Sequence, residues 1–197
     1  MKMSRLKNGL LVLLLAGACV IQVNAQTKLY INKEKSSMEV NGTSSLHDWE
    51  MEVNDFGGFL EFVAGETGLE LITNAGLTCK TESIKADNRI MDGKAHDALK
   101  SDKNPTITFT FSSIENLKSE GAVFSGIIHG DLTLAGKTNA VSIPFDGTVS
   151  GNNEVTVKGS FPLNETDYGM EPPTALMGTL KTGPEVKIVY EFMFAGK

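Results

Sequence analysis

The chain has 197 residues, of which 24 are acidic and 18 basic, so its formal net charge is −6 at pH 7. Nucleic acids and anionic lipid surfaces are bound by clustered lysines and arginines, and the scattered basic residues of this acidic chain exclude both classes of partner. A single domain of this size can bury about two-thirds of its unfolded surface, which is enough for one hydrophobic core.

The first 25 residues are organised like a signal peptide. Three basic residues precede an apolar run over residues 10–20 that is too short to span a membrane, and Ala25 provides the small residue of a cleavage site. We therefore expect residues 1–25 to be removed and residues 26–197 to form one periplasmic or secreted domain. Removal takes away three basic residues and no acidic ones, which changes the net charge to −9.

The two cysteines bear on the compartment and on stability. Cys19 leaves with the predicted signal peptide, so Cys79 has no partner for an intramolecular disulfide and the fold depends on its core. The alternative is a lipobox that ends at Cys19, which would produce a lipid-anchored protein. That motif usually has a larger aliphatic residue where Ala16 stands, so cleavage after Ala25 is the preferred interpretation.

From residue 29 onward, alternating apolar and polar residues predict strands over most of the chain. Gly57 and Gly58 are interpreted as a turn between two of these strands. The strands predicted before residue 85 are Leu29–Asn32, Met38–Val40, Trp49–Val53, Phe59–Val63, Leu69–Leu71 and Leu77–Ile84.

The segment Met91–Ser101 is predicted to be a short amphipathic helix, because its apolar residues recur at helical spacings. We expect Lys103–Pro105 to end the helix, since proline disfavours helical geometry in the residue before it. The following segment alternates with a period of two and places Ile107, Phe109 and Phe111 on one face of a strand.

The second half of the chain alternates more regularly. The elements predicted there are a long strand over Val123–Leu134, a turn at Ala135–Lys137, a return strand around residues 141–145, a hairpin connection at residues 150–153, a strand over Val155–Leu163 and a last strand over Val186–Phe194. Two glycines within Val123–Leu134 indicate bending of that strand or the close approach of another group.

Eight or more strands with short turns predict an all-β antiparallel sandwich or closed barrel. Long strands with internal glycines favour closure, which also removes exposed sheet edges. The interior of an eight-stranded barrel holds packed side chains or one small ligand. We therefore expect eight apolar residues either to line a pocket or to fill a solid core. They are Phe109, Phe111, Ile128, Leu132, Ile143, Phe161, Ile188 and Phe192.

Three motifs occur in order: Leu99–Ser101 with Pro105–Phe109, Gly130–Leu134 with Gly136 and Val141, and Asp167–Met170. With these motifs, nearly the whole mature chain resembles the YceI-like family of exported bacterial proteins. The resemblance implies an extended, eight-stranded, antiparallel lipocalin-like β-barrel. It also implies a long internal pocket that binds a polyisoprenoid or another long-chain amphiphile, and the role of a periplasmic, non-catalytic carrier.

At the mouth of such a pocket we expect Leu99, Tyr168 and Met170. The chain departs from the family pattern at Asn104, where an aromatic residue is common, and in the segment Arg89–Leu99, where the family often has an Arg-Asp pair followed by His-Leu. We therefore expect the mouth of the pocket to differ in shape from that of typical family members.

The three histidines are the first candidates for a different chemistry. His47, His96 and His129 lie far apart without the spacing of metal ligands, so solvated or hydrogen-bonded histidines are expected rather than a metal site. An acid–base pair of His47 and Asp48 would suit a small envelope hydrolase, but no motif supplies a nucleophile. A polar turn that includes Ser44 is preferred there. No motif indicates a cofactor.

The sulfur-containing side chains give no second site. Met170 and Met177 lack the clustering of copper ligands, and Cys79 lies in a strand-like segment that suits a small buried residue. The sequence thus predicts an exported lipid or isoprenoid carrier, monomeric or homodimeric. Two alternatives stay open: the hydrolase with His47 and Asp48, and a solid-core stress-response module that recognises another envelope protein.

Overall fold

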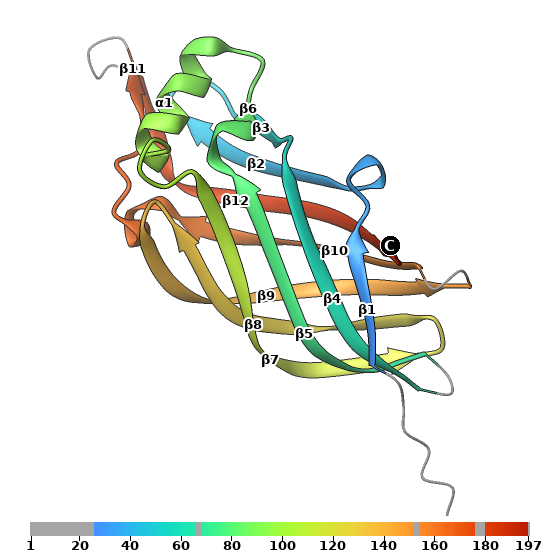
Figure 1. Ribbon diagram of the computed structural model, residues 1–197. Coiled ribbons are helices and arrows are strands. Elements are labelled where there is room, and N and C mark those ends of the chain that lie inside the picture. The colour runs from blue at the N-terminus through green and yellow to red at the C-terminus, as the bar shows by residue number, and fades with distance from the viewer. Residues whose placement is uncertain (1–25, 66–67, 152–153, 176–179, 197) are drawn as a thin grey trace, which may run out of the picture.

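A computed structural model describes residues 26–65, 68–151, 154–175 and 180–196 (Figure 1). The predicted signal peptide, Met177 and part of the predicted 150–153 connection therefore lie outside the described residues. Strands dominate the described chain and one α-helix stands at one end of it. No helix among the described residues is long and apolar enough to span a membrane.

The strands are β1 (Gln26–Ile31), β2 (Ser37–Ser44), β3 (Trp49–Val53), β4 (Phe56–Gly65), β5 (Gly68–Lys80), β6 (Ile84–Lys85), β7 (Thr106–Glu120), β8 (Val123–Leu134), β9 (Lys137–Ser150), β10 (Glu154–Asn164), β11 (Thr174–Ala175) and β12 (Leu180–Ala195). The α-helix is α1 (Arg89–Leu99), and three short 3-10 helices are η1 (Lys33–Lys35), η2 (Thr81–Ser83) and η3 (Glu165–Tyr168).

Eight strands close into an antiparallel ring, in the order β1, β4, β5, β7, β8, β9, β10, β12 and back to β1. The closing pair is short, with Tyr30 opposite Ala195 and Ile31 opposite Phe194. The predicted all-β, eight-stranded, lipocalin-like barrel is confirmed by this topology and by the structural neighbours reported below. Every strand of the ring has two hydrogen-bonded neighbours, so no strand edge of the ring is left open along its paired length.

A side branch of the sheet extends the wall at one end of the ring. One edge of β12 pairs with β1 only at the C-terminal end of β12, and over most of its length that edge pairs with β2. β3 then pairs with β2, and β6 pairs with β3. In Figure 1 this branch, β11 and α1 gather at the same end of the molecule. This end, called the α1 end below, is where the candidate site opens.

The helix is two residues earlier at each end than predicted. Asn88 caps its start, because the Asn88 side-chain oxygen accepts hydrogen bonds from the backbone N–H groups of Ile90 (3.0 Å) and Met91 (3.3 Å). Leu99 is its last residue, because Lys100 adopts a left-handed conformation with φ 54°. The helix thus ends several residues before Pro105, and proline is not what ends it.

Two predictions about the region of β4 and β5 were wrong: a turn at Gly57 and Gly58, and a break between two strands after Leu71. Gly57 and Gly58 lie within β4 rather than in a turn, since a side chain at Gly58 would collide with the backbone carbonyl of Gly76 and only glycine permits this approach of β4 and β5. The two strands predicted from Leu69 to Ile84 are mainly the single strand β5, which ends at Lys80. Irregular pairing with β4 carries β5 across its polar middle.

The predicted turn after β8 is confirmed as a two-residue hairpin. Leu134 pairs with Lys137, and the intervening Ala135 and Gly136 both have positive φ angles, 51° and 83°. This conformation matches the twist of the two strands it joins. It places the start of β9 beside the end of β8 at the α1 end.

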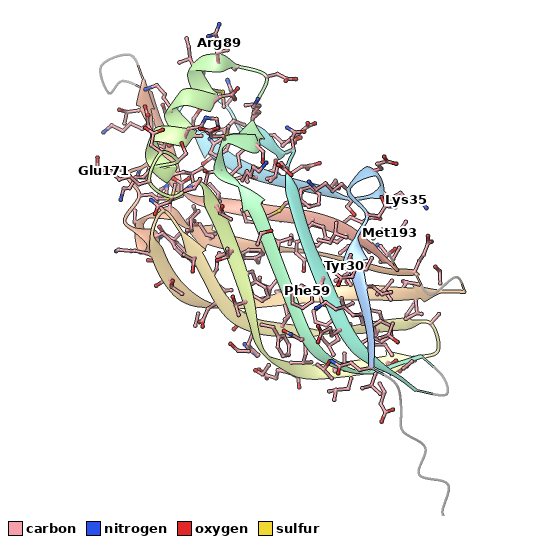
Figure 2. All side chains as sticks on the ribbon, in the orientation of Figure 1. Tyr30, Lys35, Phe59, Arg89, Glu171 and Met193 are labelled. Atoms are coloured by element: carbon pink, nitrogen blue, oxygen red, sulfur yellow. The ribbon has the colours of Figure 1, made fainter. Side chains whose placement is uncertain are left out.

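The core lies inside the ring, and the alternation of β12 illustrates it. The predicted inward set from Val186 to Phe194 is buried throughout, and Tyr190 stacks on Phe192 with ring centroids 5.0 Å apart. Met193 faces the other way and is still buried, because η1 and its flanks cover the outside of β12 there; the Met193 N–H donates to Ser36 Oγ at 2.9 Å. Figure 2 places Met193 beside this segment, with Lys35 at the outer end.

Candidate ligand-binding site

Two apolar cavities lie in a row inside the barrel. The larger, about 260 Å³, is bounded at the α1 end by α1 and by the turn between β2 and β3. The smaller, about 120 Å³, lies farther along the barrel between the long strands. The two share one wall, so they are adjoining compartments of a single interior. The side chains that line both are Met38, Cys79, Ile107, Leu132, Phe161 and Ile188.

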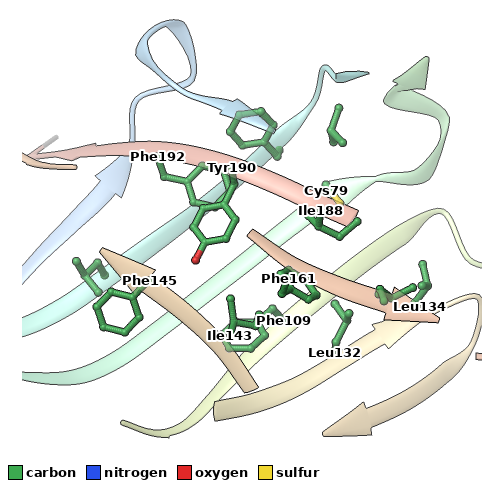
Figure 3. Close-up of a cluster of buried hydrophobic side chains, with 14 of the residues drawn as sticks. Cys79, Phe109, Leu132, Leu134, Ile143, Phe145, Phe161, Ile188, Tyr190 and Phe192 are labelled. Carbon is green, nitrogen blue, oxygen red and sulfur yellow. The ribbon is translucent and has the colours of Figure 1, made fainter. Parts of the chain in front are cut away.

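Nine of the eleven residues predicted for the pocket and its mouth line one or both cavities. Of these nine, Leu99 and Met170 line the larger cavity only. Those that line the smaller cavity only are Phe109, Ile128, Ile143 and Phe192. Those that line both cavities are Leu132, Phe161 and Ile188. Figure 3 shows this cluster, with Phe161 from β10 and Ile188 from β12 close to Leu132 from β8.

Phe111 and Tyr168 lie outside both cavities. Phe111 is half-buried and packs against the core without lining either cavity, and the pairing of β7 with β8 becomes irregular only after it. Tyr168 is fully packed rather than at an opening, with 3% of its surface exposed. Burial raises the pKa of its hydroxyl above the ordinary value.

Sequence reasoning missed the contribution of the side branch to the larger cavity. Trp49, Met51 and Val53 of β3 line it, and their alternation with polar residues is the sequence signal that could have placed them there. The Trp49 indole N–H donates to the Thr43 carbonyl at 3.1 Å and so fixes the ring at the branch. The alternation predicts an inward face for β3 but not which part of the wall it joins, because that depends on its pairing with β2.

The helix forms one wall of the larger cavity and is held by polar contacts on its other sides. Its apolar face, which includes Met91 and Leu99, lines the cavity. The Lys94 ammonium donates to the Thr174 carbonyl of β11, and His96 Nε2 lies 2.9 Å from the Ile84 carbonyl oxygen of β6. These contacts tie α1 to both neighbouring segments of the α1 end.

The histidines have separate hydrogen-bond partners, as expected. His47 Nδ1 lies 2.6 Å from the carbonyl oxygen of Asp48, and His129 Nε2 lies 2.9 Å from a carboxylate oxygen of Glu115. Ser44 Oγ accepts the His47 backbone N–H and donates to the His47 carbonyl, so it stabilises the polar turn instead of facing the ring. Within the described ranges no three His, Cys, Asp or Glu side chains form a metal-binding group.

Cys79 is a wall residue rather than a reactive thiol. It lines both cavities with 3% of its surface exposed. Burial among apolar side chains raises the pKa of the thiol to about 12. Since the thiolate is the reactive form, the thiol is kept unreactive in the folded protein.

A buried carboxyl group is the unexpected feature of the larger cavity. Glu165 is the first residue of η3, directly after β10, and 9% of its surface is exposed. It lines the cavity beside apolar groups, and its Oε2 atom has no hydrogen-bond partner among the described residues. Burial raises the pKa of this carboxyl to about 7. No local signal predicts this burial, because Glu165 stands in the polar run 164–167, which suggests only a loop.

Comparison with known proteins identifies relatives of this architecture. Residues 29–194 match the family described as the YceI-like domain. No curated protein matches the chain at a comparable level. Three solved structures illustrate the similarity of fold, each at less than 20% sequence identity.

Two of them superpose with a TM-score of 0.67. Burkholderia cenocepacia BcnA is 18% identical, with 84% of this chain and 99% of that chain covered. A polyisoprenoid binding domain from Saccharophagus degradans, implicated in plant cell wall breakdown, is 12% identical, with 88% and 100% covered. A Campylobacter jejuni YceI protein gives a TM-score of 0.59 at 16% identity, with 75% and 85% covered.

Proposed function

Because this chain belongs to the YceI-like family, we propose that it binds a polyisoprenoid or another long-chain amphiphile inside the barrel and acts as a non-catalytic carrier. The observation that carries the proposal is the shared wall of the two cavities, which makes one long apolar interior. The described polyisoprenoid binding domain from Saccharophagus degradans has the same fold, which supports the same class of ligand here.

The size and chemistry of the interior suit an apolar chain. Ligand pockets begin at about 300 Å³, a volume that the two cavities together exceed. Removing a methylene from water contributes roughly 0.8 kcal/mol, so one five-carbon isoprene unit contributes on the order of 4 kcal/mol. Four such units would outweigh even an association cost near the upper end of ~4–15 kcal/mol. Binding can therefore be tight without many polar contacts.

The two alternatives have less support. A hydrolase would need a nucleophile beside His47, and among the described residues its ring meets a backbone carbonyl while Ser44 Oγ is engaged in the turn. A solid-core interaction module would need a filled interior, and this barrel has adjoining voids instead. Carriage of a ligand therefore remains the function that the geometry favours.

We also propose that the protein is exported and acts in the periplasm or outside the cell. The support is the signal-peptide pattern of residues 1–25. Mass spectrometry of the protein recovered from envelope fractions tests this. Cleavage after Ala25 leaves an unmodified chain that begins at Gln26, whereas a lipid on an N-terminal Cys19 would establish the lipoprotein alternative.

The ligand proposal is tested first by extracting the purified protein and analysing the extract by lipid mass spectrometry. We expect a long-chain lipid in stoichiometric amount. Delipidated protein should also bind long-chain fluorescent probes. Clean protein that binds no such probe would refute the proposal.

A blocking variant tests where the chain lies. Cys79→Phe places a ring in the wall that both cavities share, and we expect it to weaken binding of a C16 probe by at least about tenfold and of a C8 probe much less. The matched control is Thr78→Phe, which adds the same ring to the exposed face of β5. Overpacking costs typically ~1–3 kcal/mol, so folding of both variants is checked by thermal unfolding. Equal loss for both probe lengths would place the ligand elsewhere.

A further inference from the structure

Glu165 is a carboxyl group in the lining of the larger cavity. It stands at the junction of β10 and η3 and lines the larger cavity, whose lining also includes Leu134, Leu163 and Met170. The tail of a long guest would extend from there past the shared wall into the smaller cavity. Glu165 is thus a carboxyl group in the larger of two adjoining apolar cavities, and it does not line the smaller one.

Among the described residues this carboxyl has no partner. Oε2 accepts no hydrogen bond, and no salt bridge of the described residues includes Glu165. Lys94 lines the same cavity, and its ammonium donates to the Thr174 carbonyl. The ammonium of Lys100, directly after α1, donates to the Gly169 carbonyl at 3.2 Å. An unpaired buried carboxyl group is costly, and such a group in a cavity indicates a partner from outside the chain.

We propose that Glu165 accepts a hydrogen bond from the head of the guest, so that the site selects long-chain amphiphiles with a donor head group, an amine or a hydroxyl, over those with a carboxylate head. This selectivity rests on the proposed ligand-binding function. An ammonium head gains both a hydrogen bond and charge pairing with an ionised carboxylate, a hydroxyl gains the hydrogen bond alone, and an anionic head is repelled.

Other titratable groups line the same cavity and have to be separated from Glu165. They are His47 in the turn between β2 and β3, Lys94 on α1, Lys181 on β12 and Cys79 on β5. The lysines would favour an anionic head, which is the opposite preference. Protonation of His47 at low pH would repel an amine, which is the same trend as protonation of Glu165. A variant at Glu165 distinguishes these sources.

The test compares a C12 amine, a C12 alcohol and a C12 carboxylate as competitors of a fluorescent long-chain probe at pH 8.5. We expect the delipidated wild-type protein to bind the amine about 10–100-fold more tightly than the carboxylate, with the alcohol between them. Glu165→Gln should reduce the amine preference to less than about threefold. Glu171→Gln is the matched control, because it removes the same charge from an exposed position in the same loop and should leave the ranking unchanged (Figure 2).

A second measurement repeats the competition with the amine and the alcohol at pH 5.5, first in the wild-type protein. The ratio of amine to alcohol affinity should fall, because the carboxyl becomes neutral, and this fall should be absent in Glu165→Gln. A fall that persists in Glu165→Gln would assign the effect to His47. Equal binding of all three head groups, or tighter binding of the carboxylate, would overturn the role of Glu165 and leave the proposed ligand-binding function standing. Failure of every C12 compound and of the probe to bind would overturn the proposed function as well.

Discussion

The buried carboxyl of Glu165 makes the stability of the apo protein depend on pH in an unusual direction. The ordinary pKa of the carboxyl is 4.5, and burial raises it to about 7 in the folded state. Between these values the unfolded chain has lost the proton while the folded chain retains it. The free energy of unfolding therefore falls as pH rises from about 4.5 to about 7, and is independent of this group above and below that window.

The magnitude follows from the same two pKa values. Their separation corresponds to about 3 kcal/mol of unfolding free energy that is present at pH 4 and absent at pH 8. Glu165→Gln retains the shape of the side chain and cannot ionise. The free energy of unfolding of this variant minus that of the wild type should rise by about 3 kcal/mol across the window.

Urea unfolding of delipidated protein at pH 4, 5.5, 7 and 8.5 measures this difference. Trp49 is the single tryptophan and lies at the cavity wall, so its fluorescence reports unfolding directly. Other titrating groups act equally in both proteins and cancel from the comparison. Glu171→Gln, at an exposed position, should differ from the wild type by a constant amount. A difference between Glu165→Gln and the wild type that does not change with pH would refute the reasoning.

Three further predictions concern other parts of the molecule. Hydrogen bonds from Lys33 and Lys80 lower the pKa of Asp55 from 3.8 to about 2, so the stabilising contribution of Asp55 is lost as pH falls through that interval. In Asp55→Asn, the loss of folded protein between pH 4 and pH 2, measured by circular dichroism, should depend less steeply on pH than in the wild type. Asn88→Ala removes the α1 cap and should lower the free energy of unfolding by about 1 kcal/mol, whereas no loss in urea unfolding would argue against the cap. The Cys79 thiol should resist maleimide labelling in native protein at pH 8 and react after unfolding, and rapid native labelling followed by mass spectrometry would show that the wall opens readily.

Much of the barrel was predictable because its signals are local. Alternation places the inward faces of β8 and β12 correctly, since successive side chains of a strand point to opposite sides whatever the strand pairs with. The hairpin at Ala135 and Gly136 was equally predictable from turn chemistry. The helix was predicted in kind, and its ends shifted by two residues because capping at Asn88 and the left-handed Lys100 outweigh a distant proline.

The candidate pocket was predictable only in part. Alternation alone identifies the side chains that face inward, and nine of the eleven predicted positions line a cavity. It does not reveal that Phe111 packs against the core without lining a cavity, nor that Gly58 serves the close approach of β4 and β5 instead of a turn. Both depend on contacts with other strands, which alternation within one strand does not encode.

The all-β character, the inward faces of the long strands and the single helix could be predicted from the sequence, because each follows from periodicity within a short segment. The closure of eight strands into a ring, the place of β3 in the cavity wall and the burial of Glu165 became visible only in the three-dimensional structure. These features arise from contacts between residues far apart in the chain. A glutamate in a polar run becomes a buried, unpaired carboxyl group only when apolar segments from several strands surround it.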